Sequence, residues 1–140
     1  MKQNNKTYLT KIFYFCAAHQ YGHDEWTKEK NYDVFGEDMF VHGHNYTLYV
    51  TVTGEIDPST GFLVDLGYLK RVVNEEVIQK LDHRQIEKDV DWFKDKQPSS
   101  ENLVEFIWNV IENRLKGCIL YRIRLQETPT IYTDYYGGIQ

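Results

Sequence analysis

The sequence predicts an α+β fold in which an antiparallel sheet is backed by two helices. Two segments near the start of the chain and two near its end are rich in aromatic and β-branched residues, which favour strands. Two segments between them repeat apolar residues at helical spacing. The predicted order of elements is therefore ββααββ, and 140 residues are enough for a single domain, residues 1–140, with its own core.

The first predicted strand covers residues 7–19, TYLTKIFYFCAAH, and contains neither glycine nor proline. A period of two places four of its side chains on one face: Phe13, Phe15, Ala17 and His19. Residues 42–54, HGHNYTLYVTVTG, alternate in the same way, with one face formed by His42, His44, Tyr46, Leu48, Val50 and Val52. The polar segment 20–41 between these strands lacks periodicity, and its length indicates a lid or the wall of a site.

The two helices are predicted from apolar stripes and capping residues. Asp65 can cap a helix that runs to about Lys80. The residues Pro-Ser-Ser at 98–100 indicate the start of a second helix, which is expected to stop at Lys116 and Gly117. Two more strands then follow: ILYRIRLQE at 119–127 and IYTDYYG at 131–137.

Charge and composition limit the class of partner. The net charge of -5 argues against nucleic acid or an anionic membrane, because both require clustered basic surface. No apolar run is long enough to span a membrane, and the first residues, MKQNNKTYLT, lack a signal-peptide core. We therefore expect a small-molecule ligand and a cytoplasmic location. Cys16 and Cys118 are interpreted as small buried hydrophobic residues without a catalytic role.

Three histidines give the strongest indication of a site. His42 and His44 lie two residues apart on one strand face, which suits chelation, and Gly43 leaves room for close approach. His19 ends the preceding strand, and pairing of the two strands would bring its imidazole to the same end of that face. Three neutral nitrogen ligands without a nearby cysteine predict a catalytic Zn²⁺ site with an open fourth position. His23 lies in the polar loop and is not expected to be a ligand.

Two positions are candidates for acid–base catalysis. Glu37 lies five residues before His42, where its carboxylate could reach the open metal position, although spacing alone favours an exposed loop acid, as it does for Asp38. Asp82 and His83 are neighbours after the first helix, and a carboxylate can hold an imidazole for proton transfer. Neither signal is specific by itself.

Glu127 continues the alternation that defines the predicted apolar face of its strand, which is formed by Ile119, Tyr121, Ile123 and Leu125. A carboxylate on a buried face needs a partner. A ligand edge with two parallel N–H donors would match the two oxygens of a carboxylate. The alternative, that the strand has ended and Glu127 is solvated, stays open.

Together these motifs resemble the 6-pyruvoyl-tetrahydropterin synthase family, which also includes the 6-carboxytetrahydropterin synthases. The matching pieces are CAAH at 16–19, FGE followed by HGHNY, GEIDPSTGFLVDLGYLK, LDHR at 81–84, PSSEN at 98–102 and QET at 126–128. The resemblance implies a tunnelling fold, in which trimers close a β-barrel and two trimers stack into a homohexamer with sites between subunits. It also implies roles for particular residues: zinc ligands His19, His42 and His44, a pterin anchor at Glu127, a proton relay through Asp82 and His83, and pocket-lining Ser99, Ser100 and Glu101.

The loop before His-Gly-His departs from most of that family. Pyruvoyl- and carboxy-forming members carry a cysteine there, whereas this loop reads GEDMFV. Glu37 instead resembles the pattern Glu-x-x-x-x-His-Gly-His of a subfamily that cleaves the side chain of 7,8-dihydroneopterin triphosphate. The predicted function is therefore a zinc-dependent lyase that forms 6-hydroxymethyl-7,8-dihydropterin for folate synthesis, with Glu37 as its base.

Three alternatives stay open: a 6-pyruvoyl-tetrahydropterin synthase, a 6-carboxytetrahydropterin synthase, and a non-catalytic module that binds a pterin or purine. The sequence does not assign the residues that hold the triphosphate. The candidates are Lys28, Lys30, Arg84, Arg122 and Arg124.

Overall fold

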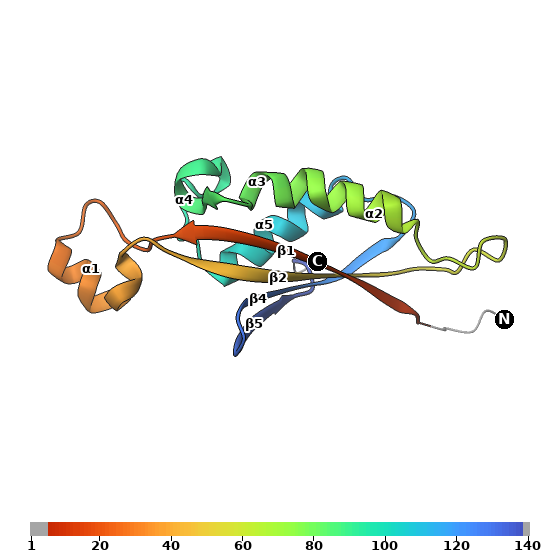
Figure 1. Cartoon of the computed structure of the whole chain (residues 1–140), viewed down its shortest axis with the longest axis horizontal. Coiled ribbons are helices and arrows are strands. Elements are labelled where there is room, and N and C mark those ends of the chain that lie inside the picture. Colours follow the sequence, from red (N-terminus) through yellow and green to blue (C-terminus); the bar gives the residue numbers. More distant parts are fainter. Residues whose placement is uncertain (1–5, 139–140) are drawn as a thin grey trace.

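A computed structural model describes residues 6–138 and confirms the α+β class (Figure 1). The sheet has five strands in the order β3-β1-β2-β4-β5, one more than predicted. The strands are β1 (Tyr8–His19), β2 (His42–Thr53), β3 (Arg84–Gln85), β4 (Ile119–Thr128) and β5 (Ile131–Tyr135). The α-helices are α1 (Lys28–Phe35), α2 (Leu66–Val73), α3 (Gln79–Leu81), α4 (Ile86–Asp89) and α5 (Ser100–Glu112).

The predicted hairpin of β1 and β2 forms the centre of the sheet. Its antiparallel register pairs Ala17 with His44 and His19 with His42, so the predicted metal ligands meet at one end of the hairpin. The alternation predicted from the sequence is confirmed, because the inward-facing residues are buried: Phe13, Phe15, Ala17, His19, Tyr46, Leu48, Val50 and Val52.

The helices α2, α3 and α5 cover one face of the sheet, whereas α1 lies apart at the end of β1 (Figure 1). Asp65 caps α2 as predicted, because its Oδ1 accepts hydrogen bonds from the backbone N–H groups of Gly67 and Tyr68. A π-helical segment, Asn74–Ile78, joins α2 to α3. None of the helices within residues 6–138 has the length and apolar character that crossing a bilayer requires.

The predicted end of the second helix at Lys116 is wrong. The helix α5 ends at Glu112 with Asn113 as its cap, and the backbone N–H groups of Arg114 and Leu115 both donate to the carbonyl of Ile111. The chain therefore leaves the helix in a tighter turn. The apolar residue Leu115 continues the buried stripe beyond the helix, which explains why the pattern overestimates its length.

Two predicted connections contain short elements. Segment 20–41 holds α1 and the 3₁₀ turn Gly36–Met39, and the stretch after α3 holds β3, α4 and the 3₁₀ turn Asp91–Phe93. The helix α1 buries only Asn31, so it has no apolar stripe that a periodicity argument can detect. Its start is nevertheless capped, because Thr27 Oγ1 accepts a hydrogen bond from Lys30 N at 3.1 Å.

The predicted inner face of β4 is wrong in its first half. Ile119 is 64% exposed, Tyr121 is exposed, and Leu120 is buried. The cause is a β-bulge opposite Thr51 and Val52, where the register with β2 shifts by one residue. Beyond the bulge the prediction holds, since Ile123 and Leu125 are fully buried. The bulge therefore leaves Glu127 on the core-facing side.

We expect Leu48→Ala to destabilise the fold by about 2–5 kcal/mol, as large-to-small core substitutions do. Leu48 is fully buried, and β-sheet pairing places it between Phe13 and Leu125. Urea unfolding at equilibrium measures the change. Thr47→Ala, one residue along the same strand, is the control and should stay within about 0.5 kcal/mol of the parent. A loss for Leu48→Ala no larger than that of the control would contradict the predicted core.

Candidate metal centre and active site

Three imidazoles form a cluster at the end of the β1–β2 hairpin. The ring centroid of His19 lies 4.5 Å from that of His42 and 5.1 Å from that of His44, and the rings of His42 and His44 are 5.2 Å apart. One ring nitrogen from each residue lies within 4.8 Å of the others. The strand pairing predicted from the sequence thus brings the three candidate ligands together, and they can hold a metal ion.

Backbone carbonyls orient two of these rings. His19 Nδ1 lies 2.7 Å from the carbonyl oxygen of Pro98, and His42 Nδ1 lies 2.8 Å from that of Phe40. Since a carbonyl only accepts, both Nδ1 atoms donate, which leaves Nε2 of each ring as the nitrogen available to a metal.

The Nε2 of His19 gives an independent test of whether the residues fit a metal. This nitrogen is buried and has no hydrogen-bond partner, although buried polar atoms are normally paired. Burial is also the main cause that lowers the pKa of His19 below its ordinary value, and His42 and His44 lower it further. The ring is therefore neutral at physiological pH, which is the protonation state that a metal ligand needs.

Glu127 lies directly beside the cluster. Its Oε1 is 3.5 Å from His44 Nε2 and 3.8 Å from His19 Nε2, and its side chain is only 16% exposed. The carboxylate is therefore not the solvated group that the sequence left as an alternative. The Glu127 carboxylate lies next to two imidazole nitrogens that could bind a metal.

Two tyrosines that the sequence does not single out also line this site. The ring of Tyr21 lies 5.0 Å from that of His19, and the ring of Tyr46 lies 5.7 Å from that of His44. Burial, followed by the charge of Glu127, raises the pKa of both phenols well above its usual range. The Tyr46 hydroxyl is buried without a hydrogen-bond partner. Tyr46 follows His44 by two residues on β2, so strand alternation places it on the face of the ligands, whereas Tyr21 lies beyond the end of β1 and carries no such signal.

Glu37 does not contact the histidine cluster in one chain. It is exposed on the turn Gly36–Met39 and accepts a hydrogen bond from the Tyr32 hydroxyl at 3.2 Å. Its neighbour Asp38 instead places Oδ1 3.7 Å from His42 Nε2. Asp38 is therefore the carboxylate of this turn that lies beside the cluster, whereas Glu37 contacts Tyr32.

Asp82 and His83 form the predicted pair, with His83 Nδ1 3.1 Å from Asp82 Oδ2. Adjacent side chains usually diverge, but His83 has φ 62°, and this left-handed conformation turns its ring toward Asp82. His83 Nε2 lies 3.8 Å from the Sγ of Cys16. Because Cys16 alternates with the inward-facing Phe15 and Ala17, the pair lies on the face of the sheet opposite the histidine cluster.

The prediction that Cys16 is a buried hydrophobic residue is wrong. Its side chain is only partly buried and contacts His83, because it belongs to the outer face of β1. Cys118 is also only partly buried, but it packs against the edge of the core, and burial raises the pKa of its thiol.

The predicted pocket residues lie at the start of α5, next to Pro98, whose carbonyl orients His19. Ser99 caps the helix by accepting a hydrogen bond from Asn102 N, and Ser100 is buried with no partner for its hydroxyl. Glu101 is exposed, but its charge contributes to the raised pKa of Tyr21. This helix start therefore borders the cluster, with Ser99 in a structural role.

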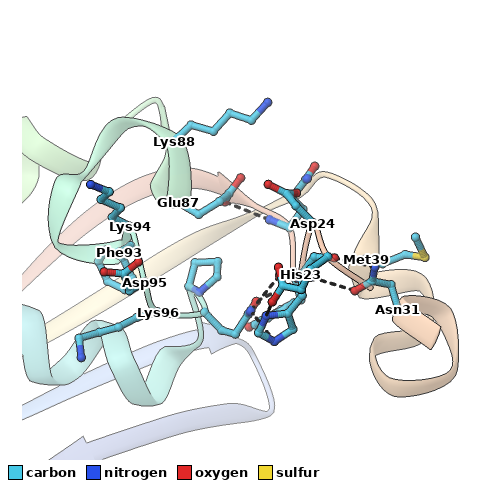
Figure 2. Close-up of a pocket in the computed structure, with 16 residues that line it drawn as sticks. His23, Asp24, Asn31, Met39, Glu87, Lys88, Phe93, Lys94, Asp95 and Lys96 are labelled. Carbon is cyan, nitrogen blue, oxygen red and sulfur yellow. Dashed lines mark hydrogen bonds and ion pairs between the residues drawn. The ribbon is translucent and has the colours of Figure 1, made fainter. Parts of the chain in front are cut away.

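The segment after His19 forms one wall of a separate pocket of about 580 Å³ (Figure 2). His23 and Asn31 come from this segment, and the opposite wall comes from residues 93–98. Lys88 and Lys96 extend away from the hollow (Figure 2). Its acidic residues, Asp24, Glu25, Glu87 and Asp95, make it a poor candidate for a triphosphate site.

Several of the triphosphate candidates have other partners. Arg124 forms two hydrogen bonds with Asp134, at 2.7 and 2.9 Å. Arg122 donates to Thr51 Oγ1, and Lys30 lies over the Trp26 ring. Lys28 and Arg84 are exposed, so the described residues do not single out a cradle for phosphate.

Comparison with known proteins gives one consistent family. The family described as 6-pyruvoyl tetrahydropterin synthase matches residues 8–138. A 6-pyruvoyl tetrahydrobiopterin synthase of Poecilia reticulata is 36% identical over 132 residues, which cover 93% of this chain and 90% of the relative. A dihydroneopterin monophosphate aldolase of Pyrococcus furiosus is 34% identical over 114 residues, which cover 81% of this chain and 82% of the relative.

A solved structure agrees with the sequence relatives. The 6-pyruvoyl tetrahydropterin synthase of Caenorhabditis elegans superposes with a TM-score of 0.90 at 30% identity and covers 99% of this chain and 100% of that chain. The fold is thus the tunnelling fold that the motifs imply. With the family match spanning nearly the whole chain, the chain belongs to the 6-pyruvoyl tetrahydropterin synthase family.

Proposed function

We propose that the chain is a zinc-dependent lyase that acts on the side chain of 7,8-dihydroneopterin triphosphate. The observation that carries this proposal is the cluster of His19, His42 and His44, whose ring nitrogens lie within 4.8 Å of one another beside a shielded Glu127. Three imidazole nitrogens with an open position are typical of catalytic zinc, and zinc makes a coordinated hydroxyl more acidic. Zinc also fits better than Mg²⁺, which prefers oxygen ligands.

We propose that Glu127 anchors the pterin ring. Its carboxylate can accept hydrogen bonds from the two N–H donors of the pterin edge, and its closeness to the histidines would place the side chain of the substrate beside the cluster. The buried Tyr46 hydroxyl offers a further polar contact to the ring. Ser99 would act only by capping α5, and Ser100 and Glu101 would border the pterin ring. Their contribution to pterin binding would therefore be smaller than that of Glu127.

The product favoured by the relatives is 6-pyruvoyl-tetrahydropterin, formed by elimination of the triphosphate. Relatives 36% identical to this chain bear that activity in their names, and the shared fold supports the same chemistry. The carbon-bound protons of the side chain must move in this reaction. The pair of Asp82 and His83 is the group in the chain best suited to shuttle them, since its imidazole is held by a carboxylate.

Side-chain cleavage to 6-hydroxymethyl-7,8-dihydropterin is the second candidate. It is favoured by the absence of a cysteine from the loop before His42 and by the aldolase named among the relatives. A carboxylate such as Glu37 is a weak base, so it suits a side-chain hydroxyl, whose acidity zinc would raise when bound, better than a carbon acid. Removal of that hydroxyl proton by Glu37 would allow the adjacent carbon–carbon bond to break in a retro-aldol step, which would serve folate synthesis.

Assembly into a homohexamer is part of the proposal. Within one chain the histidine cluster and the pair of Asp82 and His83 lie on opposite faces of the sheet, so a neighbouring copy would have to supply the pair. The outer face also exposes apolar side chains, which favours burial between copies: Tyr8, Ile12, Tyr14 and Tyr121. We also propose that the protein is cytoplasmic.

Mass spectrometry of the products formed from 7,8-dihydroneopterin triphosphate tests the function. We expect 6-pyruvoyl-tetrahydropterin as the main product of the zinc-loaded protein. Predominance of 6-hydroxymethyl-7,8-dihydropterin would establish the second candidate, and a 6-carboxy product would establish the carboxy-forming alternative. If the protein binds pterin without turnover, it is a binding module and the proposal is wrong.

The role of Glu37 is tested by Glu37→Gln beside the matched variant Asp38→Asn. If Glu37 is the base for cleavage, its replacement should lower formation of the hydroxymethyl product by about 100-fold or more while zinc stays bound. Asp38→Asn should leave that product unchanged. The reverse order of effects would assign the base to Asp38, which lies nearer to His42.

A further inference from the structure

Cys16, His83 and Asp82 lie in series as thiol, imidazole and carboxylate. Cys16 Sγ is 3.8 Å from His83 Nε2, and His83 Nδ1 is 3.1 Å from Asp82 Oδ2. We propose that Cys16 is the proton-transferring thiol of this chain and takes the place of the cysteine that its loop before His-Gly-His lacks. This inference rests on the proposed function and extends it, because it identifies the base for a carbon-bound proton.

The arrangement is held by the backbone as well as by side chains. His83 N donates to the carbonyl of Cys16 at 2.7 Å, and Cys16 N donates to Asp82 Oδ1 at 2.9 Å. These two bonds tie the turn to β1 on both sides of the thiol. They also hold His83 at φ 62°, a conformation that costs energy for a residue other than glycine. Strain of this kind persists only where the surroundings fix it, which gives the thiol and imidazole a defined geometry.

The carboxylate is suited to its place in the series. The hydrogen bond from Cys16 N is the largest cause that lowers the pKa of Asp82, and the contact with His83 lowers it further. Asp82 therefore stays charged at neutral pH, holds the Nδ1–H tautomer of His83 and stabilises the imidazolium that forms when Nε2 takes a proton. Nε2 is then the acceptor that faces Cys16.

The thiol is accessible to a ligand. Cys16 and His83 line an open groove of about 570 Å³ whose other walls include Gly43 and Asn45 of β2. The side chain of His83 is 80% exposed. This groove lies on the outer face of the sheet, the face that a neighbouring copy would cover in the proposed assembly. The thiol can thus meet a substrate held by the histidine cluster of that neighbour.

The proposed step moves protons only. His83 Nε2 accepts the proton of the Cys16 thiol, and the thiolate takes a proton from a carbon of the substrate side chain and becomes a thiol again. The imidazolium then returns its proton to another atom of the same substrate, so no oxidant or reductant is needed. A thiolate is a stronger base than a carboxylate, which makes it the better match for a carbon acid.

Alkylation tests the thiol–imidazole contact without any substrate. We expect iodoacetamide to modify Cys16 of the zinc-loaded protein faster than Cys118, which serves as the internal control because burial raises its pKa. His83→Gln and Asp82→Asn should each slow modification of Cys16 by about ten-fold, since an unassisted thiol is only a few per cent thiolate at pH 7. Equal rates in the parent and in both variants would overturn the proposal.

Product analysis tests whether the contact serves the reaction. Cys16→Ala and Cys16→Ser should both lower formation of 6-pyruvoyl-tetrahydropterin by about 100-fold, the size of a general base contribution, with zinc content and melting temperature unchanged. Cys118→Ser should leave the rate unchanged. Full activity of either Cys16 variant would overturn the proposal, as would a second zinc per chain that disappears with Cys16. If the parent itself has no turnover, the proposed function fails and alkylation alone decides the thiol–imidazole contact.

Discussion

Replacing His42 by alanine should leave the chain folded but without stoichiometric zinc and without lyase activity. The Nδ1 of His42 is held by the carbonyl of Phe40, so its Nε2 is committed to the cluster. Loss of a residue that only orients a ligand weakens metal binding by about 10- to 100-fold, and loss of a ligand itself should exceed this. Metal analysis of the purified protein measures zinc content, and the product assay measures activity.

Thermal unfolding gives a readout that does not depend on turnover. Zinc at about 1,000 times its Kd stabilises the folded state by about 4 kcal/mol, so a chelator should lower the Tm of the parent by roughly 10 °C. The Tm of His42→Ala should not respond to the chelator. His23→Ala is the matched control, because His23 lies outside the cluster and contacts Glu25 and Gln97. One zinc per chain in His42→Ala would refute the assignment of this ligand.

The sequence is sufficient to predict the parts of the fold that a long, regular pattern determines. The hairpin of β1 and β2 follows from strict alternation, and its antiparallel pairing is enough to bring His19 to His42. The helix caps Asp65 and Ser99 can also be predicted from the sequence, because each accepts hydrogen bonds from backbone N–H groups in the first turn of its helix. Such features depend on neighbours in the sequence or on one strand pairing.

Features set by tertiary contacts cannot be predicted in this way. The bulge in β4 inverts the faces of Ile119 and Leu120, and no residue type marks its position. The left-handed conformation of His83 depends on hydrogen bonds to Cys16, a residue far away in the sequence. The contact between the Cys16 thiol and the His83 imidazole therefore cannot be predicted from the sequence, although both residues belong to recognisable motifs.

The candidate site divides in the same way. Three ligands and a carboxylate on predicted strand faces can be grouped from the sequence alone, since alternation states which side chains share a face. The position of Glu37 cannot be predicted from the sequence, because Glu37 lies on a 3₁₀ turn. The side-chain directions in such a turn follow neither the period of a strand nor that of a long helix. The fold of a short turn thus decides which of Glu37 and Asp38 approaches the histidine cluster.

Glu127→Gln should retain zinc and lose substrate binding. The carboxylate is only 16% exposed and has two imidazole nitrogens within 3.8 Å, so it is positioned to hold a cationic or two-donor edge away from water. Truncating one partner of a buried, hydrogen-bonded charge pair costs about 2–5 kcal/mol, which corresponds to a fall in kcat/KM of about 30-fold to several thousand-fold. Steady-state kinetics and metal analysis of the same preparation measure both quantities.

The division of this effect between KM and kcat identifies the role of Glu127. An anchor that holds the pterin equally in the ground state and the transition state raises KM and leaves kcat unchanged, whereas a proton-transfer group lowers kcat. Glu105→Gln, which changes an exposed carboxylate on α5, should alter neither constant. Loss of zinc in Glu127→Gln would instead make the carboxylate a fourth metal ligand. In that case the pterin would need another anchor, and the buried hydroxyl of Tyr46, whose ring lies beside His44, is the group positioned to supply it.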